Sequence, residues 1–202
     1  MNKKFCIVLL AAVLTASYAQ AQFTFGARAG LNLTNFYGDE EGNSKMKPGF
    51  QIGVVCDYTL SDNFSIQPVL LFATQGAKWP DWKEKINLNY LQIPINAQYK
   101  LDLGGMKLLL QAGPYFGYAI SGKYKWEEDG EKGEEKIELG GDKEKHNMKA
   151  LDLGLGFGAG LQFGNIQAGL GYNLGLVNIN HYDLYKTKNN GLVLTVTYLF
   201  GQ

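Results

Sequence analysis

Apolar and polar residues alternate with a period of two along most of the chain after residue 22. The clearest example is residues 151–163, in which every second position is Leu, Phe or Ala and the positions between them are Asp, Gly or Gln. Successive side chains of a β-strand point to opposite sides, so this alternation is typical of a strand with one apolar and one polar face. Eight segments show the pattern and are predicted to be strands: residues 23–34, 50–60, 64–75, 90–101, 108–119, 151–163, 166–176 and 192–200.

The predicted connections between these strands alternate strictly between long and short. The long connections are residues 36–49, 76–89, 120–150 and 177–191, and the short ones are residues 61–63, 102–107 and 164–165. Short periplasmic turns and long external loops are typical of outer-membrane barrels. Several strands also match the roughly 9–11 tilted residues that cross a bilayer. The pattern therefore predicts an all-β fold, an eight-stranded antiparallel up-and-down transmembrane β-barrel with both termini in the periplasm.

The main alternative is a secreted soluble barrel or sandwich, whose strands would also alternate. Its exterior would need charged residues, but the predicted strands hold only a few: Arg28, Asp57, Lys100 and Asp152. The rest of that face is mainly Gly, Asn, Gln, Ser and Thr, which would protect a soluble sheet poorly against aggregation. We therefore assign the apolar face to lipid and the glycine-rich face to the lumen.

Glycine is the largest excess in the composition, with 26 Gly among 202 residues. On the predicted strands these glycines fall on the lumen face, where they would leave room for larger inward side chains such as Arg28, Tyr90 and Tyr115. No segment after residue 21 has 18 consecutive apolar residues. A transmembrane helix is therefore not predicted.

Aromatic residues gather at the ends of the predicted strands, as in the two interfacial girdles of a membrane barrel. At the periplasmic ends we expect Phe23, Tyr58, Phe64, Tyr99, Phe163, Tyr198 and Phe200. At the outer ends we expect Phe36, Tyr37, Trp79, Trp82, Tyr124, Trp126, Tyr182 and Tyr185.

The first 21 residues are typical of a secretory signal peptide rather than of the fold. Lys3 and Lys4 precede an apolar run over residues 5–16, and Ala19-Gln20-Ala21 forms a small-x-small cleavage site. The apolar run is too short for a membrane helix, which needs about 20 residues. We predict cleavage between Ala21 and Gln22, which leaves residues 22–202 as a single barrel domain that is exported to the cell outer membrane.

The charge balance excludes some partners. With 19 basic and 19 acidic residues the formal net charge is zero, so the chain has no overall field that would attract nucleic acid. Two Cys cannot supply a disulfide-dense scaffold or a four-cysteine zinc site. The expected surroundings are outer-membrane lipid and lipopolysaccharide.

An eight-stranded barrel is just wide enough for side chains to fill its interior, so a large open pore is not expected. The lumen should hold a structural charge cluster. Arg28 and Asp57 lie on adjacent predicted strands at similar depth, and we predict an ion pair between them, with Lys100 as a candidate third member. Such a cluster would fix the register of the strands. Ion conduction is its alternative role.

Catalytic chemistry is not predicted. The two histidines, His146 and His181, both fall in long connections, and His181 has no Ser or Thr closer than Thr187. Solvated loop histidines are the better interpretation for both. The Gly156-x-Gly158-x-Gly160 run does not lead from a strand into a helix, so it is not a nucleotide-binding motif. We predict no enzyme activity, no catalytic residues, no cofactor and no metal site.

The segment 123–149 concentrates charge, with seven Lys and nine Asp or Glu. Its glycines at 130, 133, 140 and 141 are turn signals, which makes a protruding hairpin plausible, although a solvated loop is the simpler expectation. The functional alternative is contact with a surface partner or with lipopolysaccharide.

Several sequence strings together resemble the outer-membrane β-barrel family of Bacteroidetes, often called porin-family or PorT-like proteins. They are FGARAGLN at 25–32, IQPVLLF at 66–72, QGAK at 75–78, YLQIPI at 90–95, AGPYFGY at 112–118, LDLG at 151–154 and GAG at 158–160. The resemblance covers essentially the whole chain after the leader and implies location and fold rather than an activity. Val69 is a departure, since such strands often carry an acidic residue there. Because Pro68, Pro94 and Pro114 recur in these strings, we expect them to sit at β-bulges.

The last predicted strand looks like the C-terminal signal that the barrel-assembly machinery reads during insertion. Leu194, Val196, Tyr198 and Phe200 share its outward face, although the chain continues for two residues after Phe200. Taken together, the sequence predicts a small integral outer-membrane barrel with a structural or surface-interaction role. The alternatives are a narrow channel for ions or very small solutes and, in a third class, a soluble binding barrel.

Overall fold

The computed structural model describes residues 22–38, 44–128, 130–142, 148–181 and 186–201. The strands are β1 (Phe23–Gly38), β2 (Lys45–Ser61), β3 (Phe64–Gln75), β4 (Ala77–Trp79), β5 (Glu84–Asp102), β6 (Lys107–Glu128), β7 (Glu131–Ile137), β8 (Leu151–Phe163), β9 (Ile166–Gly175) and β10 (Thr187–Leu199). A single 3-10 turn, η1 (Pro80–Trp82), joins β4 to β5. Within the described residues, no helix has the length and apolar character needed to cross a membrane.

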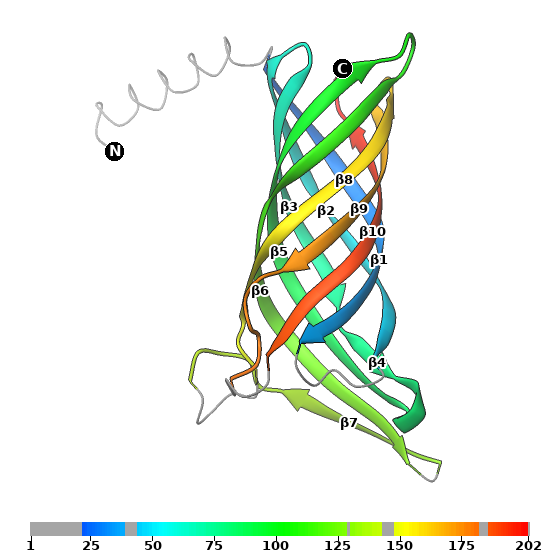
Figure 1. Ribbon diagram of the computed structural model, residues 1–202, viewed down its shortest axis with the longest axis vertical. Helices are drawn as coiled ribbons and strands as arrows, with labels where there is room; N and C mark the ends of the chain where they lie inside the picture. The colour runs from blue at the N-terminus through cyan, green and yellow to red at the C-terminus, as the bar shows by residue number, and fades with distance from the viewer. Residues whose placement is uncertain (1–21, 39–43, 129, 143–147, 182–185, 202) are drawn as a thin grey trace, which may run out of the picture.

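Eight of the strands close into an antiparallel ring in the order β1, β2, β3, β5, β6, β8, β9, β10, and β10 pairs back with β1. Each strand of the ring is followed in the chain by the next one around it. The predicted eight-stranded up-and-down barrel is therefore confirmed. Figure 1 shows it as a tall barrel of strongly tilted strands, with the C-terminus at one end and β7 at the other. Following the sequence prediction, we name these the periplasmic end and the outer end.

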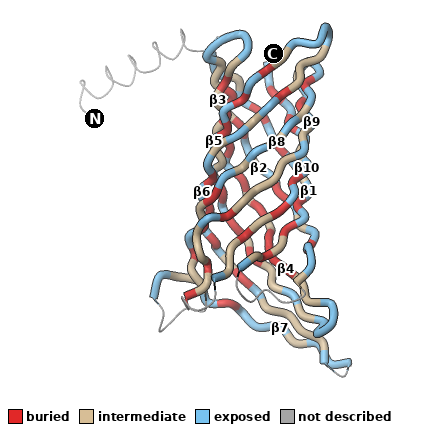
Figure 2. The backbone as a smooth tube through the Cα atoms, in the orientation of Figure 1, coloured by how far each residue is buried: buried red, intermediate tan, exposed pale blue. Residues whose placement is uncertain are grey.

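The alternation of faces is also as predicted (Figure 2). On β1 the outward side chains of Phe25 and Leu31 are 61% and 62% exposed, whereas the inward Arg28 and Asn32 are 5% and 3% exposed. An exposed belt of Leu, Ile, Val and Phe surrounds the barrel. This surface is suited to lipid, because burial in hydrocarbon would take it out of water.

The outer connections are shorter than predicted, because the strands continue beyond the apolar belt. β6 runs to Glu128 and forms a hairpin with β7, and β4 adds a short pairing between β2 and β5. Outside a membrane neither face of a sheet has to be apolar. Backbone pairing can therefore persist after the period-two pattern has ended, which is why the sequence did not reveal these extensions.

The expectation of β-bulges at the three prolines is wrong. Pairing passes Pro68, Pro94 and Pro114 with an unchanged register, and the shifts in the ring lie elsewhere, at Thr59/Ser61 and Asn89/Tyr90. A proline removes one N–H donor from the ladder without adding a residue to the strand. Pairs on both sides of it can therefore stay in step.

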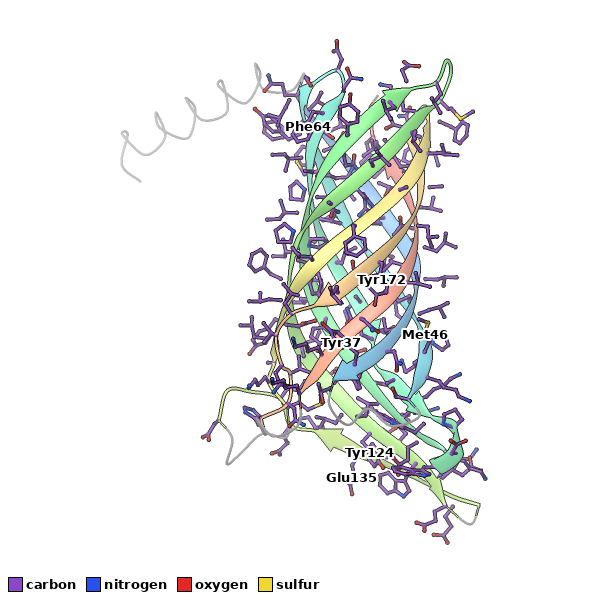
Figure 3. All side chains as sticks on the ribbon, in the orientation of Figure 1. Tyr37, Met46, Phe64, Tyr124, Glu135 and Tyr172 are labelled. Atoms are coloured by element: carbon purple, nitrogen blue, oxygen red, sulfur yellow. The ribbon has the colours of Figure 1, made fainter. Side chains whose placement is uncertain are left out.

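The structure agrees with the predicted aromatic girdle at the periplasmic end better than with the one at the outer end. At the periplasmic end Phe23 stacks on Tyr58 and Tyr198 meets Phe200 edge-on, with ring centroids 4.6 and 5.7 Å apart. Phe64 lies at this end as well (Figure 3). At the outer end Phe36 is only 3% exposed, so its placement in a lipid-facing girdle is wrong. Tyr182 and Tyr185 lie outside the described residues.

Candidate functional site

A buried ion pair lies in the periplasmic half of the lumen. Lys100 Nζ on β5 is 2.6 Å from Asp57 Oδ2 on β2, and the two side chains are 6% and 0% exposed. The intervening strand β3 presents the small, fully buried Ser65 between them. A small residue there leaves room for the long lysine to reach past β3 to Asp57.

The predicted pair between Arg28 and Asp57 is replaced by this one. Register explains the exchange, because Asp57 lies opposite Thr24 and Arg28 lies opposite Gly53, four residues further along. The Arg28 guanidinium instead donates to Thr197 Oγ1 at 2.8 Å and to Gln67 Oε1. All three residues of the predicted cluster are buried in the lumen, but the carboxylate binds Lys100 rather than Arg28.

Glutamines extend the polar network around Arg28. Gln67 donates to Gln167 at 3.2 Å and accepts from Gln98 at 3.1 Å, and Gln98 also donates to Gln111 at 3.2 Å. Gln67 on β3 and Gln167 on β9 lie on opposite walls of the barrel, whereas Gln98 and Gln111 lie on the neighbouring strands β5 and β6. They bridge the lumen and fill its periplasmic half.

Small cavities remain along the lumen. The largest of three has a volume of about 50 Å³ and lies at mid-height. Arg28 and Gln111 line it on the periplasmic side, and Gln92 and Tyr115 line it on the outer side. One wall of it is formed by backbone at Gly156 and Gly171. The other two cavities, one on the outer side and one on the periplasmic side of it, have volumes of about 10 Å³ each. The central one has room for about four water molecules, which is far from a hydrated channel.

A second polar cluster lies in the outer half, around Asp152 on β8. Its Oδ2 accepts hydrogen bonds from Asn189 Nδ2 at 2.9 Å and from the Tyr115 hydroxyl at 3.2 Å. Asn189 Nδ2 is also 3.1 Å from the Tyr90 hydroxyl. Asp152 is fully buried, and none of the ion pairs among the described residues involves it. It is held by neutral donors alone.

Apolar side chains close the lumen at the outer end, in a cluster that we call the plug. Its buried members are Phe36, Ala77, Leu88, Tyr90, Ala119, Ile137 and Ile179, and Trp79, Ile86, Tyr124, Leu139 and Met148 pack against them. They come from five of the strands and from the segments between β7 and β10. The plug covers the Asp152 cluster and separates it from the outer solvent.

The expectation that His181 is a solvated loop residue is wrong. Its side chain is 2% exposed, and Nε2 lies 2.9 Å from the carbonyl oxygen of Gly140. His181 thereby ties the segment after β9 to the segment after β7. His146 lies outside the described residues. Among the residues that are described, no three His, Cys, Asp or Glu side chains are grouped closely enough to hold a metal ion.

The β6–β7 hairpin carries exposed ion pairs outside the barrel. Glu134 lies 2.5 Å from Lys123 Nζ and also pairs with Lys125, and Glu127 lies between Lys83 and Lys132 at 3.4 and 3.6 Å. Hydrogen bonds from Lys123 and Lys125 lower the pKa of Glu134 to about 2. The Lys132 charge and the hydrogen bond from Lys83 likewise lower the pKa of Glu127.

The sequence did not reveal the plug, and it assigned Asp57 to Arg28, with Lys100 only as a candidate third member of the cluster. Phe36, Ile137 and Ile179 lie in the predicted connections, where the alternating runs are too short to mark them as core. Only the closed ring brings them together. A usable signal was present for the hairpin, because Gly130 stands at the expected turn with a φ of 87°. The turn expected at Gly133 is wrong, since this residue lies within β7 opposite Trp126.

An apolar belt around a closed antiparallel ring, with a lumen filled by its own side chains, defines a small transmembrane β-barrel. A family model described as "Outer membrane protein beta-barrel domain" matches residues 18–180. The chain belongs to this family, and it is an integral protein of the outer membrane. No curated protein sequence matches the chain.

Solved structures with a similar fold are also outer-membrane barrels. A major outer membrane protein from Thermus thermophilus has 15% identity and a TM-score of 0.50, with 88% of this chain and 99% of that chain covered. The outer membrane enzyme PagL has 14% identity and a TM-score of 0.50, with 87% and 98% covered. Neisserial surface protein A has 14% identity and a TM-score of 0.49, with 86% and 96% covered. At 14% and 15% identity, the two structures with a TM-score of 0.50 show a shared fold alone. Because one of these two is an enzyme, the fold by itself leaves activity open.

Proposed function

We propose that this protein is a closed outer-membrane barrel with a structural or surface-interaction role, and that it has no open large pore. The observation that carries the proposal is the plug, which seals the outer end of a lumen already filled by the Lys100–Asp57 pair and the glutamine network. A closed lumen makes the barrel a rigid base. The segments that project from it, above all the β6–β7 hairpin, are then the parts available for contact.

A narrow channel for ions or very small solutes is the second candidate. It draws on the central cavity of about 50 Å³ and its polar lining, which lie on the barrel axis. Conduction would require the plug side chains to separate. The two candidates therefore differ in one property, the ionic conductance of the intact protein.

Planar-bilayer recording with the purified protein tests the proposal. We expect the intact chain to give no steady conductance, because the plug, the Lys100–Asp57 pair and the glutamine network occupy the lumen between the two ends. Replacing two plug residues, Phe36→Ala with Ile179→Ala, removes packing at the seal and should raise conductance. Leu31→Ala with Leu194→Ala, on the lipid face, serves as the matched control. Steady currents from the intact chain would favour the channel and overturn the closed barrel.

A non-enzymatic role is part of the same proposal. The contact of His181 with the Gly140 carbonyl supports it, since this ring nitrogen is committed to holding the plug segments together. Prolonged incubation of the protein with outer-membrane lipids, followed by mass spectrometry, should leave every lipid mass unchanged. A new lipid product that depends on the folded protein would contradict this.

The finer family placement and the route to the membrane are proposals as well. The strings at 25–32, 66–72, 90–95 and 112–118 support a place among the PorT-like barrels of Bacteroidetes. On β10 the outward Val196 and Tyr198, followed by Phe200, are about half exposed, as a strand read by the barrel-assembly machinery would be. N-terminal sequencing of protein extracted from outer membranes should begin at Gln22. An intact Met1 would overturn removal of residues 1–21.

A protein partner at the segment 123–149 is the remaining proposal. The hairpin within it projects beyond the barrel and is largely exposed, with both Lys and Glu available. Crosslinking in cells from a photoreactive residue at position 132 should capture a surface partner, whereas the same residue at position 107, at the periplasmic start of β6, should not. An identical pattern at both positions would contradict a role for the hairpin.

A further inference from the structure

Four lysines stand side by side on four neighbouring strands at the outer end. Lys45 on β2 pairs with Lys78 on β4, Lys78 pairs with Lys85 on β5, and Lys85 pairs with Lys125 on β6. Directly opposite residues on antiparallel strands have Cβ atoms about 5 Å apart, and like charges at that separation repel. The row is therefore unfavourable unless anions lie against it.

Three of these lysines, Lys78, Lys85 and Lys125, face away from the plug. Their chain neighbours Trp79, Ile86 and Tyr124 pack against the plug. Side chains alternate along a strand, so Lys78, Lys85 and Lys125 point to the other side of the sheet. Figure 3 shows Tyr124 and Glu135, which lie opposite each other on β6 and β7, at the outer end of the molecule beyond the barrel wall.

Few carboxylates of the described residues lie against this face. Within the described part of the chain, Lys45, Lys78 and Lys85 form no ion pair, and Lys125 shares Glu134 with Lys123. Glu127 is likewise shared, between Lys83 and Lys132. The carboxylates Glu128, Glu131 and Glu135 lie on the opposite face of the hairpin. Along the two strands they alternate with Glu127, Lys132 and Glu134.

A groove runs across the same lysine face. It has a volume of about 400 Å³ and is lined by Lys83, Lys85, Lys125 and Lys132, with Glu127, Glu134 and the backbone around Gly133 between them. This size matches sites that take a sugar or another small organic group. Four amines against two carboxylates leave the groove positive.

The groove also lies at the right height for a lipid headgroup. On β6 the outward side chains change from apolar at Tyr118 and Ile120, which are 58% and 49% exposed, to Lys123 and then Lys125. Five residues of tilted strand place Lys125 about 13 Å above Ile120 along the membrane normal. Lysine stems can bend back toward the membrane surface over several ångströms. The amines thus reach the level at which outer-leaflet phosphates begin.

We propose that this face, consisting of Lys78, Lys83, Lys85, Lys125 and Lys132, binds the phosphate groups of a doubly phosphorylated glycolipid of the outer leaflet. The sugar occupies the groove, and its phosphates neutralise the lysine row. Continuity with the lipid-facing belt makes a membrane lipid the ligand rather than free phosphate. The site needs the outer-membrane location of the barrel, but it does not depend on whether the lumen conducts.

Lipid binding to the full barrel in phosphatidylcholine nanodiscs tests the proposal, with diphosphoryl lipid A as the probe and its dephosphorylated form as the comparison. The variant Lys78→Gln/Lys85→Gln/Lys125→Gln should bind the probe about 100-fold more weakly, because each lysine at a membrane surface strengthens binding about fivefold. The matched control Lys107→Gln/Lys149→Gln/Lys186→Gln removes the same charge elsewhere and should bind like the unchanged protein. Heat-modifiable gel mobility verifies that both variants are folded.

A second variant reverses the expected direction. Glu134→Gln removes a competing carboxylate and frees Lys123 and Lys125, so it should tighten binding about fivefold. A purely structural role for these charges would give no such gain. Equal binding by the triple lysine variant, equal binding of dephosphorylated lipid, or displacement of the probe by inorganic phosphate alone would each overturn the proposal.

Discussion

Lysine–carboxylate pairs occur in the lumen and on the hairpin, and the two sets differ in burial. Lys100 and Asp57 meet at 2.6 Å with side chains 6% and 0% exposed, whereas Lys83 and Glu127 meet at 3.4 Å with side chains 62% and 34% exposed. Breaking a buried pair leaves an uncompensated charge and costs several kcal/mol. An exposed pair is screened by solvent and contributes little.

This difference in burial gives the charges of the two regions different roles. In the lumen, charges and amides hold opposite walls of the barrel together and occupy the space that a channel would need. On the hairpin, charges contribute little to folding and remain available to bind something else. A substitution should therefore act on stability in the first region and on surface contacts in the second.

The largest effect is expected for Lys100→Met. It leaves the Asp57 carboxylate buried without a cation and should lower the free energy of unfolding by about 3–5 kcal/mol. Urea titration in detergent micelles, followed by the heat-modifiable mobility of the folded barrel, measures it. The control Lys107→Met, at the periplasmic start of β6, should stay within about 0.5 kcal/mol of the unchanged protein. A small effect at Lys100 would mean that water reaches Asp57.

The Asp152 cluster should show an intermediate effect. Asn189→Ala removes the hydrogen bonds to Asp152 Oδ2 and to the Tyr90 hydroxyl, both of which are buried. We expect a loss of about 2 kcal/mol in the same urea titration. Asn190→Ala, on the neighbouring residue that faces the other side of β10, is the matched control. Equal losses from both variants would contradict a specific role for the cluster.

Ring strands and lumen-facing residues could be predicted from the sequence because lipid imposes an apolar residue at every second position. Side-chain partners across the lumen could not, since they depend on how far adjacent strands are staggered. Arg28 and Asp57 are on adjacent strands and share a face, yet the register sets Asp57 opposite Thr24. Lys100 reaches Asp57 over an intervening strand, a relation that no local pattern encodes.

The outer end was the least predictable region for a different reason. Beyond the bilayer the sheet continues without an apolar face, so β7 and the end of β6 resemble a charged loop in the sequence. Plug residues such as Phe36 and Ile179 are far apart in the chain and lie in segments without a sustained apolar pattern. The hairpin lysines could be counted, but only the strand pairing sorts them onto one face.

A small effect on stability is expected at the exposed pairs. Lys83→Ala removes one contact of Glu127, which keeps Lys132 as a partner. The free energy of unfolding should change by only a small fraction of the loss at Lys100, because solvent screens an exposed pair. Urea titration measures it against Lys186→Ala, an exposed lysine outside the ion pairs that the described residues form. A loss comparable to that of Lys100→Met would erase the distinction between the two regions.

The smallest expected effect is the loss of the Glu134 ion pairs at low pH. The pKa of Glu134 is lowered from 4.5 to about 2, so its pairs with Lys123 and Lys125 are fully present above the ordinary pKa and are lost as the pH falls toward about 2. Carbon-13 NMR of the glutamate carboxyl groups should show Glu134 titrating well below its ordinary value. Lys123→Gln should move the midpoint upward. A midpoint near 4.5 in the unchanged protein would show that these pairs do not form.

A double-mutant cycle on Lys100 and Asp57 tests the closed lumen most directly. The single variants Lys100→Met and Asp57→Leu and the double variant together give the coupling energy between the two side chains. A lumen packed by its own side chains predicts a coupling of about 3 kcal/mol or more, with the double variant more stable than either single one. A coupling below about 1 kcal/mol, the value of a solvated pair, would contradict a closed lumen.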